Sequence, residues 1–277
     1  MKNYGYIERE ITPDNYVLGG LFSAPFEVLQ ENGQWLDYLP ENEEQRKEGY
    51  ESYGCTQYGT LNAIEMLIKR KWNEIKNYSE RFVGVVAENT PTGNEPHNTA
   101  EAIRHFGSID DYYLPFSVNF VSFNEYYSPK PMTKFYLDIA LKWLEEYNFR
   151  HEYVFGSFAS LKDKQEAIIN ALKTSPVGVS VVAWFEKNGL YYKPDGTKDN
   201  HWTVCVGYKE NEYFIIYDSY DGFIKKLEWN YNFGRAKRYW VEKKPEYVKI
   251  SIMSQIIAKM AKIVELLTKL VKSPENK

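Results

Sequence analysis

Residues 54–65 read GCTQYGTLNAIE, and this stretch decides the fold. Apolar residues recur at helical spacing from position 61 to position 68, so we expect a helix from Gly54 to about Lys76. Cys55 would lie in its first turn, where unpaired backbone N–H groups carry partial positive charge and favour a thiolate over a thiol. A small buried residue on an apolar helix face is the alternative. Cys55 is therefore a candidate nucleophile that needs a base.

The chain changes its hydrophobic period after Pro176. The upstream half favours helices, including one that would start with Asn98 as its N-cap. The downstream half is rich in β-branched and aromatic residues and favours strands. Helices followed by strands predict an α+β protein of two lobes. The expected helices cover 98–106, 132–147 and 161–173, and the expected strands cover 177–184, 201–208, 213–218 and 238–241.

A candidate base opens one of these strands. His201 follows a polar, turn-rich segment and begins the run HWTVCVGY. Asp218 ends the hairpin partner, where a carboxylate can accept a hydrogen bond from the imidazole and hold its orientation. A hydrogen-bonded histidine at a strand end and an Asx-turn aspartate are the alternatives. The order of cysteine, histidine and polar acceptor is much more specific than any one of them.

In this order the chain resembles the papain-like cysteine peptidases over roughly residues 45–245. Residues 54–65 are similar to that family's cysteine helix, and His201 with the following Val-Gly-Tyr is similar to its histidine block. The sequence YDSYDG at 217–222 stands where the family has Asn-Ser-Trp-Gly. Three further stretches carry the resemblance: YSERFV at 78–83, GSIDDYYLPF at 107–116 and SPVGVSV at 175–181.

The resemblance implies a helical N-terminal lobe, an antiparallel, barrel-like β lobe, and acyl transfer by Cys55, His201 and Asp218. Asp218 replaces the family's asparagine. The family's oxyanion glutamine is expected six residues before the cysteine, at Gly49, and the nearest upstream glutamine is Gln45, which needs a local insertion to reach the site. The expected substrate is a peptide or protein, with no cofactor and no metal. A peptidoglycan amidase or endopeptidase with the same triad and an inactive structural or virion-associated protein are the alternatives.

Composition argues against several other classes of protein. The formal net charge of −4 disfavours a nucleic-acid binder. Two cysteines exclude a disulfide framework and a four-cysteine zinc site, and the second, Cys205, is expected in the core. The N-terminus lacks an apolar signal region, and no apolar run approaches the roughly 18 residues of a transmembrane helix. We therefore expect a cytoplasmic or virion-associated protein.

The sequence divides into an N-terminal arm (1–44), a catalytic domain (45–248) and an amphipathic helix with a tail (249–277). In this last region apolar residues step by three and four between positions 253 and 270, which is a heptad pattern. Such a helix can join copies of the chain as a coiled coil, pack on its own domain or attach to a membrane surface. These three interpretations stay open from the sequence.

Overall fold

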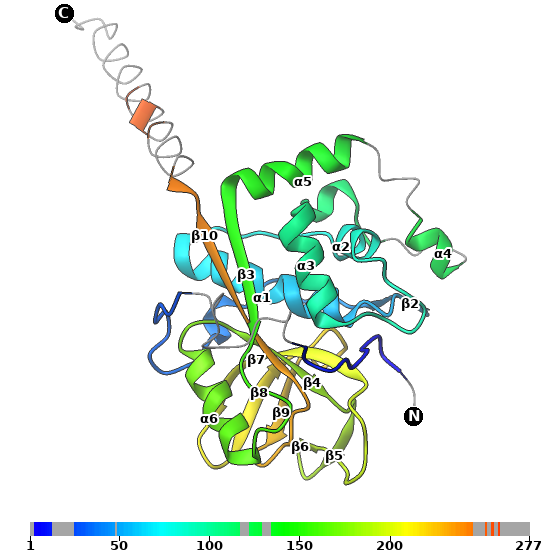
Figure 1. Cartoon of the computed structure of the whole chain (residues 1–277), viewed down its shortest axis with the longest axis vertical. Coiled ribbons are helices and arrows are strands. Elements are labelled where there is room, and N and C mark those ends of the chain that lie inside the picture. Colours follow the sequence, from blue (N-terminus) through cyan, green and yellow to red (C-terminus); the bar gives the residue numbers. More distant parts are fainter. Residues whose placement is uncertain are drawn as a thin grey trace, which may run out of the picture.

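The computed structural model describes residues 3–12, 25–47, 49–116, 122–128, 134–245 and the single positions 253, 256, 257 and 260. Most helices precede most strands, and in Figure 1 most helices lie in the upper part of the molecule, with α6 beside the lower strands. The helical elements are η1 (Leu36–Tyr38), α1 (Cys55–Trp72), α2 (Glu80–Val86), α3 (Pro96–Phe106), η2 (Asp111–Tyr113), α4 (Phe123–Tyr126), α5 (Lys134–Glu146) and α6 (Leu161–Leu172). The strands are β1 (Arg46–Lys47), β2 (Tyr50–Glu51), β3 (Tyr147–Tyr153), β4 (Val177–Val181), β5 (Phe185–Lys187), β6 (Leu190–Tyr192), β7 (His201–Lys209), β8 (Tyr213–Tyr217), β9 (Ile224–Glu228) and β10 (Ala236–Lys243).

Eight of the strands form one sheet in the order β3-β10-β4-β7-β8-β9-β6-β5. Every neighbouring pair is antiparallel except β6 and β9, which are parallel. Helix α1 contacts β7, β10 and β4, so the helix that begins with the candidate nucleophile packs directly on the sheet. The structure confirms the predicted α+β fold.

The close approach of α1 to β7 depends on a glycine. A Cβ atom on Gly59 would lie 2.8 Å from Cδ1 of Trp202, which is buried in β7. Any larger residue would push α1 away from this strand. The helix ends at Trp72 rather than at about Lys76, because Asn73 takes a left-handed conformation (φ 55°) and its backbone N–H closes the last turn.

One local prediction was wrong, and several strands were missed, of which β3 is the longest. Asn98 is not the cap of α3: the helix begins at Pro96, and the Glu95 carboxylate accepts a hydrogen bond from the His97 N–H (3.3 Å). Strand β3 was not predicted at all. It follows α5 with no intervening turn. No glycine, proline or polar cluster therefore marks the point where the helical spacing of apolar residues changes to the alternation of a strand.

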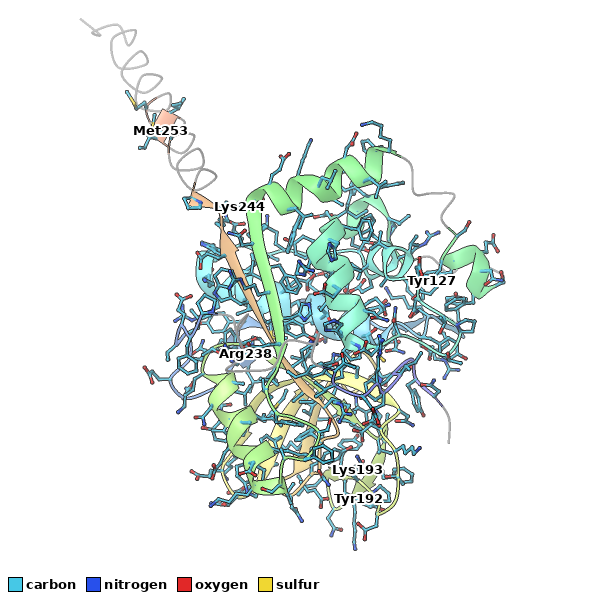
Figure 2. All side chains as sticks on the ribbon, in the orientation of Figure 1. Tyr127, Tyr192, Lys193, Arg238, Lys244 and Met253 are labelled. Carbon is cyan, nitrogen blue, oxygen red and sulfur yellow. The ribbon has the colours of Figure 1, made fainter. Side chains whose placement is uncertain are left out.

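Charged side chains are buried where β10 pairs with β3. Arg238, near the middle of the molecule in Figure 2, pairs with the buried Glu152. The fully buried Lys237 lies 3.0 Å from Nδ1 of His151 and 3.9 Å from the centroid of the Tyr153 ring. Burial lowers the pKa of Lys237 to about 7.

Replacing Lys237 by methionine should stabilise the fold more at pH 6 than at pH 9.5. The unfolded chain keeps the ordinary lysine pKa, so above about pH 7 it binds a proton that the folded state lacks, and wild-type stability rises with pH. The advantage of methionine should therefore shrink by about 3 kcal/mol between these two pH values. Urea unfolding of both proteins measures it, and an equal advantage at both pH values would contradict the prediction.

The predicted C-terminal helix lies largely outside the described residues. Its four described positions, Met253, Ile256, Ile257 and Met260, are helical and exposed. They give the predicted coiled coil no support. In the described part of the chain, no helix is both long enough and apolar enough to cross a membrane.

Candidate active site

Cys55 is the first residue of α1 and is completely buried. It packs with Tyr6 and Trp202. Burial raises the pKa of the Cys55 thiol well above its usual value, although backbone hydrogen bonds at Trp202 and Thr56 act in the opposite direction. Desolvation thus outweighs the helix start that the sequence suggested would favour a thiolate. In this state of the site, Cys55 is a thiol.

His201 and Asp218 form the pair that the sequence predicted. His201 opens β7, Asp218 follows β8, and both side chains are fully buried. The His201 Nε2–H donates to Asp218 Oδ1 at 2.5 Å. The other ring nitrogen, Nδ1, is buried and has no hydrogen-bond partner among the described residues. Because Cys55 is hydrogen-bonded to the backbone of Trp202, the residue after His201, the thiol and the imidazole lie at the same end of β7.

Aromatic rings surround the imidazole. The Trp184 ring centroid is 5.7 Å from that of His201, with the planes near perpendicular, and the Tyr220 centroid is 5.3 Å away. Tyr4 from the N-terminus supplies a third ring at 5.9 Å. Tyr220 and Trp184 both lie against the imidazole that donates to Asp218.

The second oxygen of Asp218 faces a lysine that sequence reasoning missed. Lys225 Nζ lies 2.9 Å from Asp218 Oδ2, and the lysine is buried in β9. Burial alone would raise the pKa of Asp218, but the charges of His201 and Lys225 and their hydrogen bonds outweigh it and hold the pKa below its usual value. The carboxylate is therefore ionised between two cationic or donor groups.

Gln45 immediately precedes a short hairpin that leads to Cys55. Strands β1 and β2 form a two-stranded hairpin between Gln45 and Cys55, and the Gln45 side chain is completely buried. Its Nε2 has three acceptors: the Tyr220 hydroxyl (2.7 Å), the Glu51 carboxylate (2.9 Å) and the Tyr4 carbonyl (2.9 Å). Its Oε1 accepts from the Ser219 hydroxyl (2.8 Å), which fixes the orientation of the amide.

Residues 3–10, here called the N-terminal segment, cover the site. Figure 1 shows this segment in dark blue, between the helices and the sheet. The Tyr4 N–H donates to the Asn200 carbonyl (3.0 Å), next to His201 in sequence, while the Tyr4 carbonyl accepts from Gln45. On the helical side, Asn94 exchanges backbone hydrogen bonds with the segment, and the Tyr6 ring stacks on Trp202 at 5.9 Å. The segment thereby buries Cys55.

The fit of this segment depends on two glycines. Gly5 has φ +106°, and a Cβ atom there would lie 2.3 Å from the Tyr53 carbonyl oxygen. A Cβ atom on Gly93 would lie 1.8 Å from the Gly5 carbonyl oxygen. Neither position has room for a side chain while the segment stays in place.

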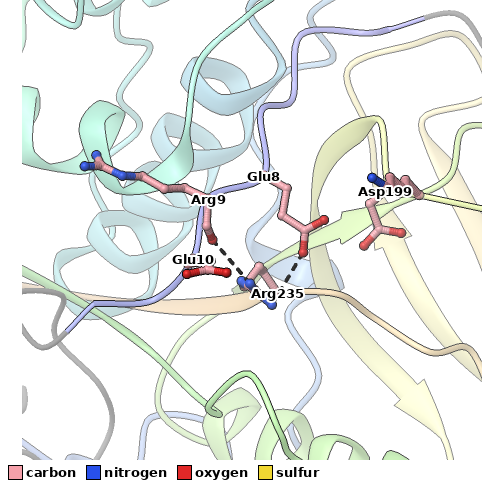
Figure 3. Close-up of a pocket in the computed structure, with 6 residues that line it drawn as sticks. Glu8, Arg9, Glu10, Asp199 and Arg235 are labelled. Atoms are coloured by element: carbon pink, nitrogen blue, oxygen red, sulfur yellow. Dashed lines mark hydrogen bonds and ion pairs between the residues drawn. The ribbon is translucent and has the colours of Figure 1, made fainter.

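The far end of the segment is held by charges. Arg235 forms an ion pair with Glu8 (3.5 Å) and donates to the Arg9 carbonyl (3.2 Å), as Figure 3 shows. Asp199 lies nearby and accepts from the Ser180 hydroxyl (2.5 Å) and from Lys193 (2.6 Å). These groups border a pocket of about 530 Å³ lined entirely by charged residues: Glu8, Arg9, Glu10, Lys198, Asp199 and Arg235.

Cys205 is a core residue, as predicted. It is completely buried in β7, and its Sγ donates to the Gly207 carbonyl (3.5 Å). Burial raises its pKa to about 12, so it is a poor nucleophile. Within the described ranges, no group of three or more metal-ligating side chains is assembled.

No protein-family model and no curated protein matches this sequence. Solved structures do match in fold. Digestive procathepsin L 3 from the Tenebrio molitor larval midgut aligns with a TM-score of 0.57 and 14% identity over 86% of this chain and 76% of its own. Xylellain, a cysteine protease from Xylella fastidiosa, gives 0.55 and 16% over 87% and 96%. The bromelain protease from Ananas comosus gives 0.53 and 16% over 76% and 98%.

These likenesses define the class of fold. The helical first part and the mainly antiparallel sheet match the papain-like cysteine proteases. Because the identities are low, the likeness concerns the fold alone, and the chemistry has to be argued from the side chains described above.

Proposed function

We propose that the protein is a cysteine peptidase that hydrolyses peptide bonds through Cys55, His201 and Asp218. The observation that carries this proposal is the state of the His201 ring. Its Nε2 is occupied by Asp218, whereas its buried Nδ1 has no hydrogen-bond partner among the described residues. A ring oriented at one nitrogen and open at the other, at the same end of β7 as a cysteine that starts a helix, is suited to take up a thiol proton.

In the acylation step, His201 Nδ1 accepts the proton of the Cys55 thiol, and the sulfur attacks the substrate carbonyl carbon. The C–S bond forms as the carbonyl π electrons move to oxygen. We assign the stabilisation of this oxyanion to the Cys55 backbone N–H and the Gln45 amide. The Tyr4 carbonyl, which already accepts from Gln45 Nε2, supports this role for the amide. His201 then gives its proton to the leaving nitrogen as the C–N bond breaks.

In the deacylation step, water enters where the amine has left. His201 removes a proton from this water, and the oxygen attacks the acyl carbon. The C–S bond breaks, the carboxylic acid leaves, and the sulfur takes back the proton from His201. Throughout the cycle Asp218 accepts from Nε2 and stabilises the protonated ring, which is the role of the acidic member of such triads.

Two assays on the full-length chain carrying Gly5→Val test this function, since that substitution is designed to uncover Cys55. We expect the protein to release soluble peptides from casein and to form a covalent adduct with a peptidyl epoxide at Cys55, located by mass spectrometry. A matched Cys205→Ala variant should behave identically. The additional Cys55→Ala substitution should abolish both signals.

Assaying casein and peptidoglycan side by side separates the alternative functions. Cleavage of purified peptidoglycan without cleavage of casein would replace the peptidase by a peptidoglycan amidase or endopeptidase. A folded protein that cleaves neither substrate and forms no epoxide adduct would contradict the proposed function. That result would favour an inactive structural protein.

A further inference from the structure

Strand β9 places a lysine where its alternation calls for an apolar residue. Along Ile224–Glu228, residues at alternate positions are buried, and Lys225 occupies one of the buried positions while Ile224 is exposed. Burying an ammonium group costs several kcal/mol unless it is paired and hydrogen-bonded. Because this strand exposes its isoleucine and buries its lysine, the buried ammonium group must have partners that compensate the cost of burial.

The Lys225 ammonium is fully engaged with the loop that follows β8. It lies 2.9 Å from Asp218 Oδ2 and donates to three backbone carbonyls of residues 220–222, at 3.0 to 3.4 Å. It also sits 5.2 Å from the centroid of the Trp184 ring, which packs against His201. The lysine thus fixes the carboxylate that orients the imidazole, and its loop as well.

The Asp218–Lys225 pair has no net charge. An isolated buried carboxylate beside His201 would strongly favour the protonated imidazole, which then could not accept the thiol proton. With an ammonium on Oδ2, the carboxylate still accepts from Nε2 through Oδ1, yet its long-range field is cancelled. Toward His201, the ion pair behaves as a neutral hydrogen-bond acceptor.

We propose that Lys225 is a positioning residue of the site, which holds Asp218 toward His201 and neutralises its charge. Among the residues that the structure describes, the remaining titratable groups around this pair supply no second cation. Glu51 is tied to Tyr220, whose hydroxyl donates to its carboxylate at 2.7 Å. The titratable groups that face the pair from neighbouring elements are Cys55 of α1, Glu51 of β2, Tyr191 of β6, Tyr220 of the following loop and Tyr4 of the N-terminal segment.

The test follows the His201 ring in the full-length protein by NMR with ¹⁵N-labelled histidine, with its signals assigned by their loss in His201→Gln. Lys225→Gln keeps a donor for the loop carbonyls but removes the charge. We expect its His201 ring to stay protonated to a pH about one unit or more above the wild-type midpoint. Lys225→Arg should return the midpoint to the wild-type value. Lys226→Gln, which changes the exposed next residue of β9, is the matched control and should not move it.

A second pair of variants tests the charge coupling between Lys225 and His201 without relying on Lys225→Gln in the wild-type background. Asp218→Asn leaves the ammonium unpaired, and adding Lys225→Gln to it should raise the His201 midpoint again by a similar amount. A merely structural lysine would lower the melting temperature and leave all midpoints unchanged, and this result would overturn the proposal. The proposal would also be overturned if the His201 midpoint of the double variant equalled that of Asp218→Asn.

The role in catalysis rests on the proposed function, but the titration does not. The coupling between Lys225 and His201 is measured from the NMR signals of the His201 ring, and this measurement does not require an active enzyme. Failure of the peptidase proposal would appear instead as absence of Cys55-dependent hydrolysis with the titration shifts intact. The two failures are therefore distinguishable.

Discussion

Gly5→Val is expected to raise the rate at which iodoacetamide alkylates Cys55 by roughly 10- to 100-fold, because a strained positive-φ residue costs about 1–3 kcal/mol. The valine Cβ would overlap the Tyr53 carbonyl oxygen, which lies 2.3 Å from the Cβ position, so the segment can no longer keep its conformation. Its displacement removes Tyr6 from Cys55. Mass spectrometry of timed samples measures the rate for each cysteine separately.

The uncovered thiol should also react at lower pH than the covered one. Burial is the main cause of the raised pKa of Cys55, and solvent entering at the displaced segment removes part of that desolvation. The rate of alkylation should therefore begin to rise at a lower pH in Gly5→Val than in the wild type. Cys205, buried in β7, serves as an internal reference that should stay unmodified in both proteins.

Gly189→Val is the matched control for this prediction. Gly189 has φ +79°, so valine is strained there too, but no atom lies within 4 Å of its Cβ position. This variant should show wild-type alkylation of Cys55 and a comparable change in melting temperature. If Gly5→Val alkylates no faster than Gly189→Val, the segment does not control access to the thiol.

The second large effect is the loss of hydrolysis when either reacting side chain is truncated. In the Gly5→Val chain, Cys55→Ala and His201→Ala should each lower kcat by about 10⁴-fold or more, since nucleophile and base act as a unit. For the same reason the double truncation should cost no more than the larger single loss. Casein hydrolysis with purified, folded variants measures all three.

The control for these truncations is Cys205→Ala, which removes a core thiol and touches no proposed reacting group. It should lower stability by a modest amount and leave kcat within about twofold of its parent. Retention of activity in Cys55→Ala would assign the hydrolysis to another protein in the preparation or to another residue. Strictly additive losses would argue against a shared step for cysteine and histidine.

The sequence was sufficient for the division into helices and sheet and for the pairing of His201 with Asp218. Both depend on local signals: helical spacing after Cys55, and strand-like runs bounded by turns at His201 and Asp218. Asp218 and His201 then meet because the two strands pair as a hairpin, as the register of β7 and β8 shows. These contacts are near in sequence and could be predicted.

The rest depends on contacts between distant parts of the chain. Lys225 looks like an ordinary surface lysine in the run IKKLE, and only the strand register turns it toward Asp218. Tyr4 carries no motif, and its carbonyl meets the Gln45 side chain although the two residues are 41 positions apart in the sequence. The one available signal was the alternating pattern of Ile224–Glu228, in which Lys225 shares the inward face with Leu227.

Strand β10 determines how the site can open. It pairs with β3 from Lys237 to Lys243 and with β4 from Ala236 to Arg238, and β3 continues directly from α5. A continuous ladder of backbone hydrogen bonds therefore joins the helical half to the sheet, which resists any hinge motion between them. The segment over Cys55 lies outside this sheet and is held by its own hydrogen bonds and ion pairs, so we expect it to open independently of the sheet. Access to the thiol is then a local event, whose rate should change little when the core is made more stable.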